Sequence, residues 1–186
     1  MRKRRIRLVA LFVAMVTCTS APGTTLARMS VAQMTHAARN IVRARCLANS
    51  TAWDAGEIWT FTTFEVDENW KGTLRDKHVV VRLLGGTLGG LTSSVSGVPR
   101  FVQGEDVILF LEPTARGDFS VVSWMQGTFR VRRDRASGYE SVTQDTARSS
   151  TFDSATRRFE SSGIRGVSLN AFRAAVAAAL NSGENQ

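Results

Sequence analysis

Adjacent acidic residues occur at two places in the chain, and paired carboxylates are the residue types best suited to acid–base chemistry. The pairs are Asp67–Glu68 and Glu105–Asp106. Glycosidases use two carboxyl groups that lie about 5–10 Å apart. Neighbouring acids at the end of a strand are also common as solvated turn residues, and no further catalytic motif accompanies these pairs. The two acid pairs are compatible with a small hydrolase, which we keep as an alternative. They are not sufficient to indicate one, and we assign no catalytic residue.

Metal-binding and nucleophile motifs are missing from the sequence. His36 and His78 are far apart and have no partner at the spacing of a zinc site. The calcium loop pattern is absent around Glu65 and Asp67, and no Gly-x-Ser-x-Gly elbow occurs. We therefore expect no metal and no cofactor.

Four residues remain as candidates for binding: Trp53, Gly86, Gly89 and Arg100. Trp53 lies in a segment, residues 49–56, whose composition predicts a loop, and binding interfaces favour exposed tryptophan. Gly86 and Gly89 belong to the run Gly85-Gly-Thr-Leu-Gly-Gly90. A phosphate-binding loop would need a helix after the glycines, but a β-like segment follows, so the run predicts a flexible loop between strands.

The N-terminus has the pattern of a secretory signal peptide, which we assign to residues 1–27. A basic start precedes the unbroken apolar run Leu8–Val16, and small residues that suit cleavage follow, with Ala21 and Ala27 as the two candidate positions. The run is too short to span a membrane, which takes about 20 apolar residues. We expect export to the periplasm or the extracellular space; lipid attachment at Cys18 is an alternative.

Charge and cysteine content argue against two classes for the exported chain, nucleic-acid-binding proteins and disulfide-stabilised proteins. Five of the 24 basic residues and none of the 16 acidic residues lie within residues 1–27, so the remainder has 19 against 16 and a net charge of +3. Its charges alternate in sign, which argues against a nucleic-acid partner. Only Cys46 remains, so no intrachain disulfide can form, and Cys46 is expected to be a buried, apolar-like residue. We expect no stable membrane span after cleavage, and a monomer.

The organising element is the stretch Glu57–Gly72, the longest run of β-favouring residues. Alternation places Ile58 and Phe64 on one face, while the opposite face begins aromatic and ends acidic. A strand of this kind is expected to be long and bent.

Further strands are expected on both sides of it, in a β-barrel domain of residues 28–143 that begins with a short helix from Ser30. The other expected strands are residues 41–48, 78–84, 91–96, 106–112, 119–126, 128–133 and 139–142. The apolar run within 106–112 predicts a strand buried on both faces. Residues 144–166 predict a loop, residues 167–182 an amphipathic helix packed on the barrel, and residues 183–186 a polar tail.

The order of these elements resembles that of netrin-like domains and tissue inhibitors of metalloproteinases. The residues that carry the resemblance are the strand Ile41–Cys46, the stretch Trp59–Gly72 and the strand Val79–Arg82, within about residues 38–112. The resemblance implies a single OB-like, Greek-key β-barrel with a terminal helix. The inhibitors use an N-terminal cysteine to chelate the protease zinc; this chain has no such cysteine, so no inhibitory residue is carried over.

The chain also resembles exported bacterial proteins of unknown function, through Gly85–Gly90, Ser96–Phe101 and Gly104–Leu111. That family implies no activity. We therefore expect a mainly β, non-catalytic exported binding module with an unknown protein or glycan partner. A secreted protease inhibitor acting through a loop and a small secreted hydrolase are the alternatives.

Overall fold

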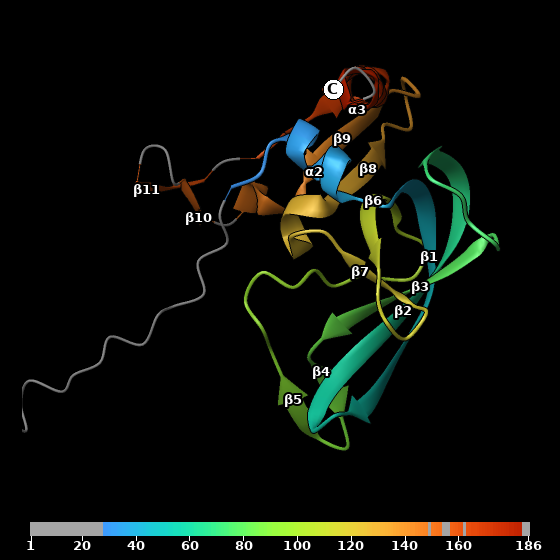
Figure 1. Ribbon diagram of the computed structural model, residues 1–186, viewed down its shortest axis with the longest axis vertical. Helices are drawn as coiled ribbons and strands as arrows, with labels where there is room; N and C mark the ends of the chain where they lie inside the picture. Colours follow the sequence, from blue (N-terminus) through green and yellow to red (C-terminus); the bar gives the residue numbers. More distant parts are fainter. Residues whose placement is uncertain (1–27, 149, 154–156, 162, 184–186) are drawn as a thin grey trace, which may run out of the picture.

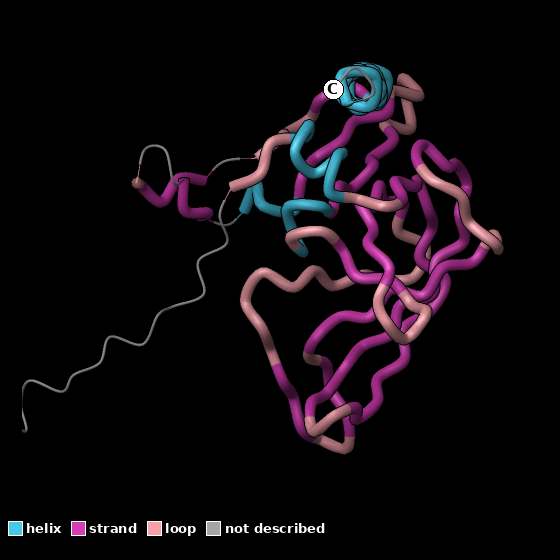
Figure 2. The backbone as a smooth tube through the Cα atoms, in the orientation of Figure 1, coloured by secondary structure: helices cyan, strands magenta, loops and turns pink. Residues whose placement is uncertain are grey.

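The protein is mainly β-structure, with its longer helices gathered at one end (Figure 1; helices are cyan in Figure 2). The computed structural model describes residues 28–148, 150–153, 157–161 and 163–183. The strands are β1 (Asn40–Asp54), β2 (Glu57–Lys71), β3 (His78–Leu84), β4 (Gly86–Leu88), β5 (Leu91–Ser93), β6 (Asp106–Pro113), β7 (Phe119–Val121), β8 (Thr128–Arg133), β9 (Glu140–Gln144), β10 (Ser150–Asp153), β11 (Arg158–Ser161) and β12 (Val167–Ser168). The helices are α2 (Val31–Ala37) and α3 (Leu169–Gly183), with 3-10 turns η1 (Trp124–Gly127) and η2 (Asp145–Arg148). No helix among the described residues is long and apolar enough to cross a membrane.

The principal sheet runs β1-β2-β3-β7-β6-β8-β9-β12. β1 also pairs with β6 along its other edge, so β1, β2, β3, β7 and β6 are joined in a circuit of pairings. The step from β3 to β7 is parallel and consists of the single pair Val81 and Phe119. β8, β9 and β12 extend the sheet from β6 outside this circuit.

The β1–β2 hairpin is the longest feature of the sheet, and it corrects the loop expected at residues 49–56. Pairing continues to Asp54 and Glu57, so only Ala55 and Gly56 form the turn, both with positive φ. A two-residue turn of this type matches the twist of paired strands. Cross-strand pairing with β2 thus holds polar residues of low β propensity in β1. The prediction for β2 itself is confirmed.

β6 divides the molecule into two hydrophobic clusters, as its apolar sequence predicted. Val107, Leu109 and Leu111 face one cluster, which also holds Phe64 and Cys46. Ile108 and Phe110 face the other, which lies beneath the helices. Residues 107–111 are fully buried, so both faces of the strand lie in the interior along this run.

The helices cover the second cluster. A capping box between Ser30 and Gln33 starts α2. α3 buries Leu169, Phe172 and Val176 as its stripe predicted, and the Phe172 ring lies 4.6 Å from that of Phe129.

The Lys-Gly sequence that ends β2 connects the hairpin to α2. Lys71 Nζ donates to the carbonyl oxygens of Thr35 and Ala38, each at 2.6 Å, which satisfies the end of the helix. Gly72 has φ +79°, and a Cβ there would lie 2.4 Å from the Arg39 carbonyl oxygen. The end of the organising strand is therefore a structural junction.

Three other expectations are corrected. Residues 119–126, expected as one strand, form β7 and then η1, because Ser123 and Trp124 adopt positive φ and interrupt the extended backbone. Residues 85–90, expected as a loop, contain β4, which pairs with β5. Within residues 144–166, expected as a loop, lie η2 and the β10–β11 pair.

Candidate functional site

Trp53 lies near the end of β1 and exposes 56 % of its surface. Its cross-strand partner is the buried Ile58. The two-residue turn follows at once, so the exposed indole lies at the paired end of the long β1–β2 hairpin. Since the backbone is fixed by pairing, little conformational entropy is lost if the side chain enters a partner surface.

Gly86 packs the β4–β5 hairpin onto the β1–β2 hairpin. Its φ is +148°, and a Cβ there would lie 2.6 Å from Thr60 Oγ1 and 2.7 Å from Thr51 Cγ2. Only glycine permits this approach. Gly89 lies in the turn of the β4–β5 hairpin, with φ +59° and open space around it. The next strand begins with Leu91, which is 59 % exposed.

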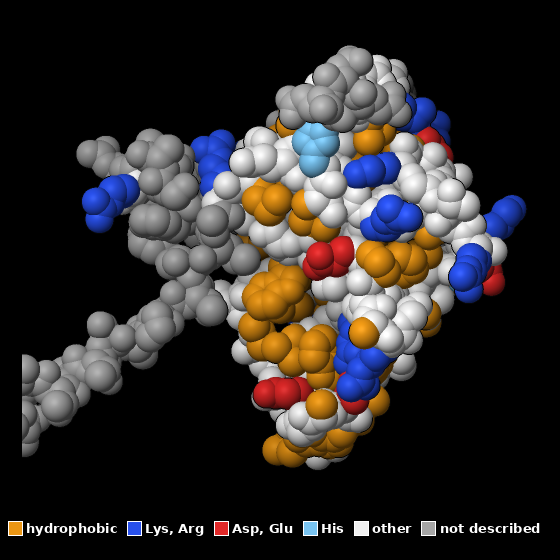
Figure 3. Space-filling model, viewed as in Figure 1, with side chains coloured by type: hydrophobic (Ala, Val, Ile, Leu, Met, Phe, Trp, Pro, Cys, Tyr) orange, Lys and Arg blue, Asp and Glu red, His pale blue; other side chains and the backbone are white. Residues whose placement is uncertain are grey.

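The structure therefore brings three of the four predicted residues, Trp53, Gly86 and Gly89, to one end of the molecule. We call residues 51–58 and 86–92 the hairpin tip. It occupies the lower end of Figure 1, and Figure 3 shows hydrophobic side chains gathered there. Leu91 was not among the predicted binding residues, although its place after a Gly-Gly turn indicates an exposed position.

Arg100 does not lie at the hairpin tip but braces its base. Its guanidinium donates to the carbonyl oxygen of Gly85 at 3.1 Å and to Thr60 Oγ1 at 3.3 Å. Longer bonds reach the carbonyl oxygens of Leu84 and Ser93. Arg100 thus positions the β4–β5 hairpin, and its role is structural support of the candidate site.

A second brace holds the other hairpin. Arg82 pairs with Asp54, the residue after Trp53, and stacks over the Trp59 ring at 4.2 Å. Arg116, from the β6–β7 loop, also pairs with Asp54. Bonds from Arg82 and Arg116 lower the pKa of the Asp54 carboxyl. Asp54 is therefore neutralised by two guanidinium groups, although it lies next to the exposed indole.

A cleft of about 950 Å³ lies elsewhere on the surface, between the segment 98–105 and strands β8 and β9. Arg130 lies within it and pairs with Glu105 and, at 2.8 Å, with Asp145. Burial opposes its charge, but the bonds that Arg130 donates to Asp145 and Glu105 outweigh this effect and raise the pKa of Arg130. Its guanidinium also stacks over the Phe101 ring at 4.7 Å. None of these contacts followed from the sequence.

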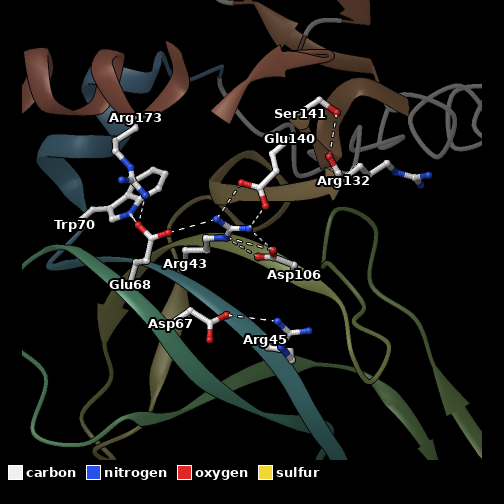
Figure 4. A network of polar contacts seen from close by, with 10 residues as sticks. All are labelled: Arg43, Arg45, Asp67, Glu68, Trp70, Asp106, Arg132, Glu140, Ser141 and Arg173. Atoms are coloured by element: carbon white, nitrogen blue, oxygen red, sulfur yellow. Dashed lines mark hydrogen bonds and ion pairs between the residues drawn. The ribbon is translucent and has the colours of Figure 1, made fainter. Parts of the chain in front are cut away.

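Arg43 is the centre of a polar network on the other face of the sheet (Figure 4). It bonds Asp106 through Nε at 3.0 Å and a terminal nitrogen at 2.6 Å, Glu140 at 2.7 Å and Glu68 at 3.3 Å. The bonds that Arg43 donates to Asp106 raise the pKa of Arg43 despite desolvation. Arg173 of α3 extends the network by pairing with Glu68. The network fastens α3 and β9 to the β1–β2 hairpin.

The acid pairs considered for catalysis are thus occupied by arginines. Glu68 and Asp106 belong to the Arg43 network, and Glu105 accepts from Arg130 and from the Val102 amide. Across the described residues, no group of three or more His, Cys, Asp or Glu side chains is arranged to hold a metal. Cys46 is buried, and desolvation raises the pKa of its thiol, which disfavours the reactive thiolate.

No family model, curated protein or solved structure matches the chain. Its function is therefore argued from its own residues.

Proposed function

We propose that this chain is an exported, non-catalytic module that binds another protein through the hairpin tip. The observation that carries the proposal is the exposure of Trp53 and Leu91 on two hairpins that are packed together and braced by arginines. Interfaces concentrate their binding energy in a few such residues, with tryptophan foremost.

The fold that we propose is an OB-type barrel. Support comes from the circuit of pairings β1-β2-β3-β7-β6. In this circuit β3 and β7 pair in parallel, and β1 pairs with a strand along each of its edges. OB-type barrels are five-stranded, partly open and commonly bind their ligands with loops and strand faces. The added strands and α3 close the second hydrophobic cluster on the outside of this barrel.

Export is proposed from the sequence of residues 1–27, which lies outside the described residues. The basic start, the short apolar run and the small residues near Ala21 and Ala27 support it. The final destination, periplasm or extracellular space, and lipid attachment at Cys18 belong to the same proposal.

The chemistry of the hairpin tip favours a protein as the partner. The tip is a projection with apolar side chains, which suits an apolar pocket of another protein. Its charged residues are acidic, Asp54 and Glu57, and it has no Lys or Arg. A bilayer with anionic lipids attracts basic residues, so it is disfavoured. A glycan would require several open hydrogen-bonding side chains around the indole, and the neighbouring Asp54 is already paired with Arg82 and Arg116.

Chemical cross-linking in the native envelope fraction or culture medium, followed by mass spectrometry, tests this proposal. The wild type should form an adduct with one defined protein, and Trp53→Ser and Leu91→Ser should lose it. Tyr139→Ser is the matched control, because Tyr139 is also exposed, at 51 %, but lies on the β8–β9 connection at the opposite end of Figure 1. Equal adducts in all variants, or monomer alone in every condition, would reject the proposal.

The same experiment addresses the inhibitor alternative. If the captured protein is a protease, activity assays with and without the purified chain decide whether binding inhibits it. The hydrolase alternative has no favouring observation, since the acids once considered for it accept bonds from arginines.

A further inference from the structure

In the cleft between segment 98–105 and strands β8 and β9, the acidic side chains form ion pairs, whereas the side chain of Arg132 forms none with any described residue. Its acidic side chains already have cationic partners: Glu105 and Asp145 pair with Arg130, and Asp106 pairs with Arg43. These contacts fix the acids against the wall of the cleft. Negative charge in the cleft is therefore largely neutralised by the protein itself.

Arg132 differs from these acids in that its charged group has no partner among the described residues. It lies two positions after Arg130 on β8, so the two side chains leave the same face of the strand. Its side chain is exposed, and no described residue forms a hydrogen bond or ion pair with its guanidinium; only its backbone carbonyl accepts a bond, from Ser141. Figure 4 shows the guanidinium directed away from the Arg43 network. The cleft thus offers a guanidinium with its donors available.

The lining of the cleft also includes apolar side chains. Val98, Pro99 and Met125 are among them, while Arg130, Arg132 and Thr143 come from strands β8 and β9. A volume of about 950 Å³ lies within the range of ligand-binding clefts. The arrangement suits a ligand that combines a carboxylate with an apolar neighbouring group.

We propose that this cleft binds an acidic peptide segment, with Arg132 as the anchor for a carboxylate. A guanidinium matches a carboxylate with two parallel hydrogen bonds. Adjacent apolar side chains of the peptide would contact Val98, Pro99 and Met125. This site is separate from the hairpin tip and does not depend on the protein-binding function proposed for it.

Other anionic polymers fit less well. A nucleic-acid backbone carries a charge at every phosphate and little apolar surface between them, so it would leave Val98, Pro99 and Met125 without a contact. An acidic sugar would gain affinity from stacking on an aromatic ring, yet among the described residues no aromatic side chain lines the cleft. The ring nearest to it, Phe101, is covered by Arg130.

Isothermal titration of the purified mature chain with the peptide Val-Glu-Leu-Glu-Val-Glu-Leu tests the proposal, with the glutamine counterpart as the neutral probe. We expect the acidic peptide to bind and the neutral one to bind at least about tenfold more weakly. Arg132→Gln should weaken the acidic peptide by a similar factor with an unchanged melting temperature. Arg135→Gln, at an exposed position in the following turn, is the matched control and should bind like the wild type.

The contrary results are equally defined. Equal binding of the two peptides, no binding of the acidic peptide, or an unchanged affinity of Arg132→Gln would overturn the proposal. Tighter binding of a hexagalacturonate than of the acidic peptide would overturn the assignment of a peptide ligand. Trp53→Ser should leave peptide binding unchanged, so failure at the hairpin tip and failure at the cleft are distinguished.

Discussion

Replacing Arg43 by methionine should destabilise the fold strongly, because this arginine joins acids from three strands. The Arg43 side chain is only 13 % exposed and holds Asp106, Glu140 and Glu68. Methionine fills the space of the aliphatic part of the Arg43 side chain. The stability that is lost is therefore that of the guanidinium's ion pairs and hydrogen bonds. Removing one partner of such a partly buried network costs about 3–5 kcal/mol, because the remaining charges stay desolvated and repel one another.

Urea denaturation followed by circular dichroism measures this cost. For a chain of this size, the loss corresponds to a decrease of about 6–20 °C in melting temperature. Arg45→Met is the matched control on the same strand, because the Arg45 side chain is 51 % exposed and lies 4.0 Å from Asp67 Oδ2. An exposed pair of this kind contributes about 0–1 kcal/mol.

The reasoning can also be tested with a second substitution. Adding Asp106→Asn to Arg43→Met should recover part of the lost stability, because it removes one of the uncompensated carboxylates. A loss below about 1 kcal/mol for Arg43→Met, equal to that of Arg45→Met, would refute the role assigned to the network.

Four further predictions follow from the packing and the titrating groups. Gly86→Ala should lower the free energy of unfolding by about 2 kcal/mol or more, against about 1 kcal/mol for Gly89→Ala, and equal losses in urea denaturation would contradict the packing of the two hairpins. Lys71→Met should cost about 1 kcal/mol and increase amide hydrogen exchange in α2; unchanged exchange would exclude Lys71 as its cap. Because the bond from Arg43 lowers the pKa of Glu140, the stability from this carboxylate is complete above about pH 5 and is lost as pH falls through its folded-state pKa. Glu140→Gln should therefore be less stable than the wild type at neutral pH and differ less from it at about pH 3 in urea denaturation, whereas a pH-independent difference would contradict the linkage. Cys46 should react with a thiol reagent only at the rate of unfolding, and rapid labelling of the folded chain would contradict its burial.

Alternation of residue types was sufficient to predict the strands that bury a complete face. β2, β3 and β6 occur where their apolar residues indicated, and the two-sided burial of β6 follows from an apolar run between charges. The stripe of α3 was equally informative. In these elements the hydrophobic effect acts through local periodicity, which a sequence displays directly.

The hairpin tip could be predicted only in part, because its structure depends on pairing between distant residues. The extension of β1 to Trp53 results from its register with β2, and local composition favoured a loop. Gly86 and Arg100 were selected as binding residues, but their contacts with Thr60 show that they pack and brace the hairpins. Tertiary contact, which propensity does not encode, decided these positions.

The ion networks could not be predicted at all. Glu68 and Asp106 stood out as members of acidic pairs, yet each finds its partner, Arg43, on another strand. Sequence spacing does not reveal which charges on different strands will meet. The same limit applies to Arg132, whose open guanidinium is recognisable only once the neighbouring acids are known to be occupied.

The most direct measurement of protein binding through the hairpin tip is the affinity of the cross-linked partner, once purified, for the wild type and for Trp53→Ala. A central tryptophan of an interface contributes about 2 kcal/mol or more, so the dissociation constant of Trp53→Ala should rise by about 30-fold or more. Tyr139→Ala should bind like the wild type. Equal dissociation constants for Trp53→Ala and the wild type would contradict binding through the hairpin tip.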